Sequence, residues 1–190
     1  MCAQCKPNNN IKVTDTQLAS QLSGLLHKVL NFHEVDGLSQ MVLHELGHEN
    51  SFSFNRATYL IDNPDFNHLL GVAGYSCDEC HFHKQDLWQD PYSFLKDMDS
   101  AQYHNKVKTF LNDGLKKTDL NLESSKEIHE LGNILGLEKP EFLFWKMKHG
   151  NNGLLLFESK LNNQDLEPES FNWRRAFLHN ITALLSFCGI

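Results

Sequence analysis

The sequence FLFWKMKHGNNGLLLFE, residues 142–158, predicts a β-hairpin. Aromatic and aliphatic residues fill the two ends of this stretch, and glycine and asparagine gather in its centre, which is typical of two strands and a turn. We expect the strands over residues 142–147 and 154–158. The turn is expected over residues 149–153, where Asn152 and Gly153 form a dipeptide that readily adopts the left-handed conformation of tight turns.

Helical patterns lie on both sides of the hairpin. Apolar residues recur at helical spacing in five segments, which predicts helices over residues 15–31, 36–49, 91–112, 125–136 and 167–187. Asp36 is the expected N-cap of the second helix, and Pro91 fits the first turn of the third. The last segment carries the broadest apolar surface, so we expect it to be the central helix of the core.

The segment between the second and third helices has a mixed pattern. Residues 51–54 alternate like a strand, residues 56–61 fit either state, and we assign neither. Residues 69–75 contain two glycines in an apolar run, which indicates a buried segment where another piece of backbone approaches closely. The patterns together predict a single α+β domain over residues 1–190, mostly helical, with about five helices and a small antiparallel sheet.

Composition and charge restrict the classes of partner. Hydrophobic residues make up 41% of the chain and charged residues 22%, as in ordinary globular proteins. The formal net charge is −7 and the lysines are scattered, so we expect neither nucleic acid nor a membrane as a partner. The first ten residues lack the apolar run of a secretory signal, and the longest apolar stretch is too short to cross a bilayer. These features predict a soluble protein of the cytoplasm.

Two pairs of cysteines share the spacing Cys-x-x-Cys: Cys2 with Cys5, and Cys77 with Cys80. At this spacing one turn of backbone can direct both sulfurs at a single ion, and two such pairs complete the tetrahedral thiolate shell of a structural zinc site. Random placement of the cysteines would produce two such pairs with an expectation of only about 0.01. We therefore expect a zinc ion that pins residues 1–10 to the middle of the domain.

Three other assignments remain open for the second pair. Zinc could be bound locally, by Cys77 and Cys80 together with His81 or His83. The cysteines could also be free thiols without metal, since a reducing compartment keeps thiols reduced. The string from Cys77 to His81 also matches the attachment motif for c-type haem, but no export signal accompanies it.

Residues 44–48, His-Glu-Leu-Gly-His, match the pattern His-Glu-x-x-His. On these five residues alone, the segment resembles the zinc-binding helix of the zincin metallopeptidases. The resemblance implies that His44 and His48 would bind zinc on one face of the helix and that Glu45 would act as the general base. The third histidine of the metzincin group has no equivalent directly downstream, where residues 51–54 are Ser-Phe-Ser-Phe. The alternative is the end of a structural helix whose histidines face the solvent.

Both metal motifs imply zinc, but they imply different functions. The cysteine pairs predict a non-enzymatic protein in which zinc is structural and which acts through contacts with a protein partner. The alternative is a zinc-dependent hydrolase that uses His44, Glu45 and His48. The sequence favours the first function, because the paired cysteines are the less frequent coincidence.

Overall fold

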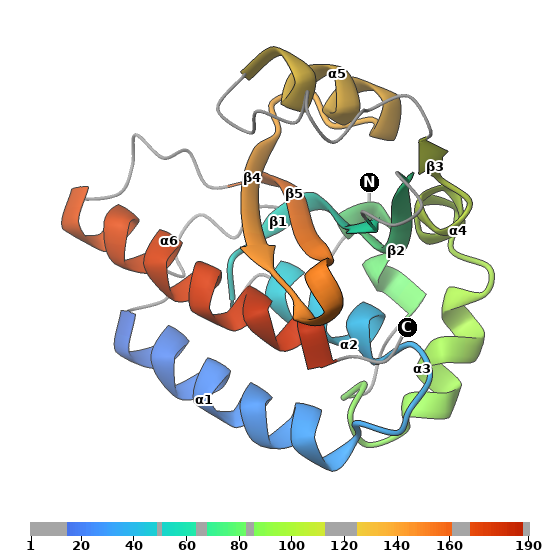
Figure 1. The fold of residues 1–190 in the computed structure, drawn as a ribbon. Coiled ribbons are helices and arrows are strands. Elements are labelled where there is room, and N and C mark those ends of the chain that lie inside the picture. Colours follow the sequence, from blue (N-terminus) through green and yellow to red (C-terminus); the bar gives the residue numbers. More distant parts are fainter. Residues whose placement is uncertain are drawn as a thin grey trace.

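The computed structural model describes residues 15–48, 51–63, 68–82, 86–112, 125–160 and 168–187. The α-helices are α1 Asp15–Asn31, α2 Leu38–Gly47, α3 Pro91–Met98, α4 Gln102–Lys108, α5 Ser125–Leu135 and α6 Pro168–Thr182. The strands are β1 Phe54–Asn63, β2 His68–Ser76, β3 Leu111–Asn112, β4 Glu141–Lys146 and β5 Asn152–Ser159. Short 3-10 helices are η2 Cys77–Phe82, η3 Lys148–Gly150 and η5 Ala183–Phe187. Helices flank an antiparallel sheet (Figure 1), which confirms the predicted α+β class.

The sheet is larger than the predicted hairpin. Its five strands follow the order β3-β2-β1-β5-β4, and each neighbouring pair is antiparallel. β1 lies in the middle, paired with β2 on one side and β5 on the other. The segment that the sequence left unassigned, residues 51–75, therefore supplies the hairpin at the centre of the sheet.

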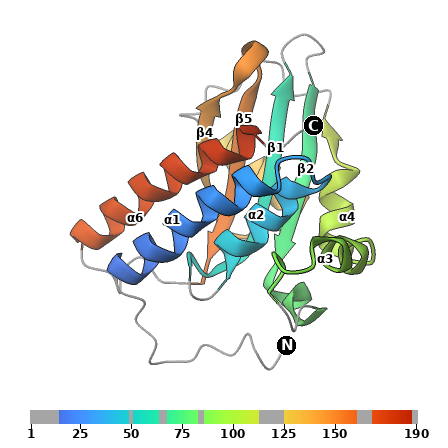
Figure 2. The ribbon, with the colours of Figure 1, turned by 90° about the horizontal axis from the view of Figure 1, so that it is seen from below.

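Alternate side chains of β5 show how the sheet separates two apolar layers. Leu155 and Phe157 pack into the layer that includes α1, α2 and the end of α6. Leu154 and Leu156 pack into the layer of α4 and α5. Figure 2 shows α1, α2 and α6 running side by side across one face of the sheet. The strand is buried on both faces, as its unbroken run of apolar residues would predict.

The central helix of the first layer is α2. Every residue of α2 except Glu45 is buried, whereas in α6 the buried side chains among those described are Leu178, Ile181 and Thr182. The prediction that the C-terminal helix is central was therefore wrong. Asp36 is not the N-cap of α2 either, because that position is Gly37 in the left-handed conformation, with φ 83°.

The hairpin of β4 and β5 is present, but its turn covers only the first part of the predicted residues 149–153. Asn152 and Gly153 belong to β5, where they pair with Lys146 and Trp145. The chain reverses through η3 instead, where Gly150 has a φ of 75°. Gly153 is required for packing, because a Cβ atom at this position would collide with the ring of Trp145.

The predicted long helix over residues 91–112 is two short helices, α3 and α4, followed by β3. The break falls at Ala101, whose backbone is extended, with φ −71° and ψ 114°. Just before it, the hydroxyl of Ser100 donates a hydrogen bond of 2.7 Å to the carbonyl of Asp97. Such local side-chain bonds offer the backbone an alternative to helical pairing, which explains the break without a proline or glycine.

Candidate functional site

The second cysteine pair lies in η2, directly after β2. Cys77 and Cys80 stand three residues apart in this 3-10 helix. Residues at that separation are stacked along one side of a 3-10 helix. The thiol of Cys77 is buried and donates a hydrogen bond to Oδ1 of Asn55, with an Sγ–Oδ1 distance of 3.2 Å. Cys77 is therefore tied to β1.

The partners of Asn55 define the orientation of its side-chain amide. Nδ2 of Asn55 donates a hydrogen bond of 2.9 Å to Oε2 of Glu158, and an ionised carboxylate only accepts. The amide oxygen is therefore the atom that faces Cys77. Metals bind cysteine as the thiolate, so binding of a metal by Cys77 would break this hydrogen bond.

The structure does not describe the side chains of the other predicted ligands of the cysteine site. Cys2, Cys5 and His83 lie outside the described residues, and for Cys80 and His81 the description covers the backbone in η2. Within the described part of the chain, no three histidine, cysteine, aspartate or glutamate side chains gather as a metal site. The four-cysteine site and its local variant with a histidine both stay predictions.

The histidines of the His-Glu-Leu-Gly-His segment do not face the same environment. The ring of His44 is buried and packs edge-to-face against Tyr75 and Phe94, at centroid distances of 4.9 and 5.1 Å. His48 follows the last residue of α2, has an extended backbone with ψ 151°, and is exposed. The expectation of solvent-facing histidines therefore holds for His48 and is wrong for His44. A zincin helix presents both histidines to one metal ion, whereas here one ring is enclosed by aromatic side chains and the other is exposed.

Glu45, the general base of the hydrolase alternative, has structural partners. Its Oε2 accepts a hydrogen bond of 2.9 Å from Nε1 of Trp88. Its Oε1 lies 3.3 Å from Nζ of Lys28, which also stands 5.4 Å from the centroid of the Trp88 ring. The carboxylate thus joins α2 to α1 and to the segment that precedes α3. These contacts provide partners for a half-buried carboxylate, so its burial is explained without a catalytic role.

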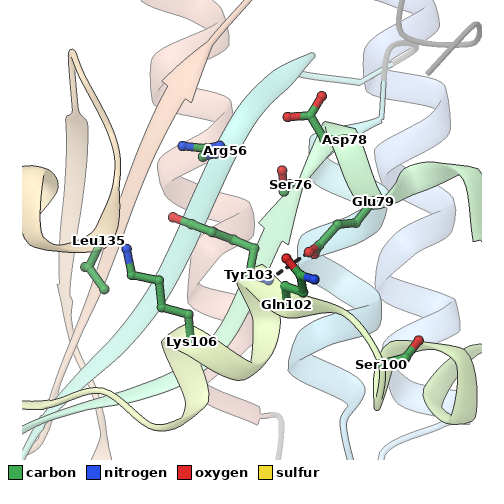
Figure 3. A pocket seen from close by; sticks show the side chains of 9 residues that line it. All are labelled: Arg56, Ser76, Asp78, Glu79, Ser100, Gln102, Tyr103, Lys106 and Leu135. Atoms are coloured by element: carbon green, nitrogen blue, oxygen red, sulfur yellow. Dashed lines mark hydrogen bonds between the residues drawn. The ribbon is translucent and has the colours of Figure 1, made fainter. Parts of the chain in front are cut away.

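A pocket of about 550 Å³ lies where β1, η2, α4 and the end of α5 meet (Figure 3). Its volume is within the range that is usual for sites of small ligands. Charged side chains of both signs line it: Arg56, Lys106, Asp78 and Glu79. In Figure 3, Lys106 stands beside Leu135 on one side of the pocket, and Asp78 and Glu79 stand on the opposite side. The pocket is therefore polar and has a basic and an acidic end.

Arg56 is held in a fixed position at the basic end. Its Nη1 donates a hydrogen bond of 2.6 Å to the carbonyl of Gly136, and its guanidinium lies 5.5 Å from the centroid of the Tyr103 ring. Among the residues that the structure describes, none supplies a carboxylate that forms an ion pair with Arg56. A half-buried guanidinium that uses one of its five donors in this way retains donors for a ligand.

Tyr103 forms the floor between the two ends. Its hydroxyl shares a hydrogen bond of 2.8 Å with Oγ1 of Thr58, and burial raises the pKa of Tyr103 above its ordinary value of 10.0. Its backbone N–H donates a hydrogen bond of 2.7 Å to Oε1 of Glu79. The second oxygen of that carboxylate, Oε2, is buried and accepts no hydrogen bond within the described residues. The acidic end therefore contains an oxygen that is fixed in place but has an unused capacity to accept.

The sequence analysis did not identify this pocket. Its residues are spread from Arg56 to Leu135 and come from separate strands and helices, so no spacing motif joins them. The nearest sequence indication is the acidic pair Asp78 and Glu79 between Cys77 and Cys80. The pocket depends on the antiparallel pairing of β1 with β2 and on the break in the chain before α4.

Comparison with known proteins gives no match: no protein-family model, no curated protein and no solved structure is significantly similar to this chain. Of the helices described, none combines the length and hydropathy of a bilayer-spanning segment. The fold and the candidate site define an α+β protein with a charged pocket next to a Cys-x-x-Cys segment. Its function must be inferred from those residues.

Proposed function

We propose that this chain is a non-enzymatic zinc-binding protein of the cytoplasm, in which Cys2, Cys5, Cys77 and Cys80 bind one structural zinc ion. The observation that carries the proposal is the position of Cys77 and Cys80 three residues apart in η2. Residues with this separation lie along one side of a 3-10 helix, so the backbone allows both thiolates to share an ion. The first pair has the same spacing in the sequence.

The long separation between the two pairs does not count against a shared ion. The entropic cost of loop closure grows logarithmically, so the loop costs roughly 1–1.5 kcal/mol more than in a compact zinc module. A structural zinc site contributes on the order of 10 kcal/mol. Breaking the hydrogen bond from Cys77 to Asn55 adds a cost of about 1 kcal/mol. Coordination outweighs both costs.

The geometry of α2 supports a role without catalysis. Glu45 contacts Trp88 and Lys28. The ring of His44 is buried against two aromatic rings, whereas His48 is exposed. A water-activating base needs a carboxylate that is available to a metal-bound water. These contacts favour the non-enzymatic function over the zinc-dependent hydrolase.

An apolar pair on α1 supports a protein partner. Leu26 and Leu30 are one helical turn apart and are 44% and 58% exposed. Residues four apart lie on the same side of a helix, so the two leucines form one small apolar surface. With a net charge of −7, this surface suits a protein better than nucleic acid.

The test is elemental analysis of protein purified without a metal-chelating tag. We expect one zinc per chain, lost in Cys2→Ser/Cys5→Ser and in Cys77→Ser/Cys80→Ser. Cys188→Ser, which changes the remaining cysteine, is the matched control and should keep its zinc. The exposed His48→Ala should also keep it. Zinc that disappears with His48→Ala but persists without the cysteines would overturn the proposal, and so would a wild-type protein without zinc.

A further inference from the structure

We propose that the pocket beside η2 binds a small zwitterionic ligand, a free amino acid or a short peptide. Its carboxylate would contact Arg56 and Lys106, and its ammonium group would contact Glu79. The inference rests on the described residues of the pocket alone. It stands or fails separately from zinc binding by the cysteine pairs.

The basic end of the pocket holds two positive charges that converge on one point. A Cβ atom built on Gly136 would lie 3.4 Å from Nη1 of Arg56 and 3.5 Å from Nζ of Lys106. Neither cation forms an ion pair with a described carboxylate. Two like charges held near each other repel, and an anion placed between them removes the repulsion. A carboxylate fits because its two oxygens match the donor geometry of a guanidinium.

The absence of a side chain at Gly136 keeps this point open. Gly136 has a φ of 85°, a conformation that glycine adopts without strain, and it ends α5. Its carbonyl accepts the hydrogen bond that fixes Arg56. One residue therefore both positions the guanidinium and leaves space beside the two cationic groups.

The acidic end offers the complementary group. Oε1 of Glu79 is engaged by the backbone N–H of Tyr103, which fixes the orientation of the carboxylate, and the buried Oε2 accepts no hydrogen bond within the described residues. A buried acceptor that lacks a donor is energetically costly. Asp78, the neighbouring residue in η2, adds a second negative charge to the same wall (Figure 3). An ammonium group in the pocket supplies a positive charge beside this wall.

The two ends together discriminate between classes of ligand. A ligand with only an anionic group would bring like charge close to Asp78 and Glu79. A ligand with only a cationic group would leave Arg56 and Lys106 facing each other. A zwitterion satisfies both ends at once, and a volume of about 550 Å³ accommodates an amino acid or a short peptide.

The first experiment measures the thermal unfolding midpoint of the full chain with four sets of probes. These are pools of free L-amino acids, pools of unblocked dipeptides, and the same dipeptides either N-acetylated or C-amidated. We expect at least one unblocked pool to raise the midpoint, because ligand that binds only the folded state stabilises it. Blocking either terminus should remove the increase. A response to amino acids alone, or to dipeptides alone, identifies the source of the zwitterion.

The second experiment measures the dissociation constant of the best probe for two variants. Lys106→Gln should raise it about tenfold or more, because a charged hydrogen bond is lost. Lys108→Gln, on the same helix but outside the pocket, is the matched control and should leave it unchanged. Glu79→Gln keeps an oxygen for the N–H of Tyr103 but removes the charge, and should weaken binding by a similar factor. Glu138→Gln, at an exposed position, is its control.

Three results would overturn the inference. The first is an unfolding midpoint that none of the unblocked pools changes. The second is an equal increase with blocked and unblocked dipeptides, because the termini would then not be recognised. The third is a Lys106→Gln variant that binds the best probe as tightly as the Lys108→Gln control.

Discussion

The indole nitrogen of Trp88 donates a hydrogen bond of 2.9 Å to Oε2 of Glu45. Trp88 is buried, and its ring packs 5.8 Å from that of Phe32, between centroids. The glutamate of the His-Glu-x-x-His pattern therefore accepts a hydrogen bond from a buried donor. This relationship assigns Glu45 to the stability of the fold, and that assignment can be measured.

Glu45→Ala should lower the free energy of unfolding by about 1–3 kcal/mol, because the buried N–H of Trp88 loses its acceptor. Glu45→Gln keeps an acceptor oxygen and loses only the ion pair with Lys28, so it should cost less than about 1 kcal/mol. Urea unfolding of the two variants measures the difference. Equal losses for alanine and glutamine would show that the charge, and not the hydrogen bond, is what the fold requires.

Gly71→Ala should be strongly destabilising. A Cβ atom on Gly71 would collide with the carbonyl of Val107, so β2 and α4 would have to separate. We expect a loss of about 3 kcal/mol, as for severe overpacking in a core. Gly24→Ala is the matched control, because nothing lies within 4 Å of the added atom in α1. It should raise stability by up to about 1 kcal/mol through helix propensity. If both variants unfold at the same urea concentration as the wild type, the close contact between Gly71 and Val107 would be contradicted.

His104 should make the protein less stable in mild acid. Burial, and then the nearby Lys108, lower the pKa of His104 from 6.5 to about 4. Between these pH values the unfolded chain binds the proton and the folded chain does not, so stability falls as the pH decreases through this window. The full effect is roughly 2–3 kcal/mol. His104→Gln cannot titrate but can still accept the hydrogen bond from the N–H of Gly74.

The measurement for His104 is the free energy of unfolding of both proteins at several pH values between 7 and 4. As the pH decreases, the free energy of unfolding of the wild type should fall more than that of the variant. A difference that stays constant across this range would show that His104 titrates normally in the folded state.

Asn55→Ala should increase the affinity for zinc by up to about tenfold, because zinc binding then no longer breaks the hydrogen bond from Cys77 to Asn55. Calorimetric titration with zinc in buffers of different ionisation enthalpy reports both the affinity and the protons released. Lys139→Ala, close to Glu158 but without contact to Cys77, is the control. An unchanged affinity for zinc in Asn55→Ala would indicate that Cys77 does not bind the zinc ion.

Local patterns were sufficient to predict several elements. The helix over residues 15–31 has the predicted bounds, and the helix that ends before Gly136 agrees within one residue, because both have regular apolar spacing and clear ends. The glycines of residues 69–75 correctly indicated a close approach of backbone, which the contact of Gly71 with α4 confirms. These features depend on residues that are neighbours in the sequence.

The missed features depend on tertiary contacts. Gly153 resembled a turn residue, but it lies in β5, where the ring of Trp145 on the paired strand leaves no room for a side chain. The sequence pattern does not contain this contact. The apolar arc of α6 is broad, yet α2 occupies the centre of the layer because β1 and β2 cover it. The pocket forms because the fold brings Arg56 and Glu79 to opposite ends of one cavity, and no local pattern predicts this arrangement.

The most direct test of the zinc proposal is X-ray absorption spectroscopy at the zinc edge on protein loaded with one equivalent of zinc. We predict a shell of four sulfur atoms at about 2.3 Å, from the two Cys-x-x-Cys pairs. A shell dominated by nitrogen and oxygen atoms at about 2.0–2.1 Å would contradict this proposal and would direct attention to the histidines instead.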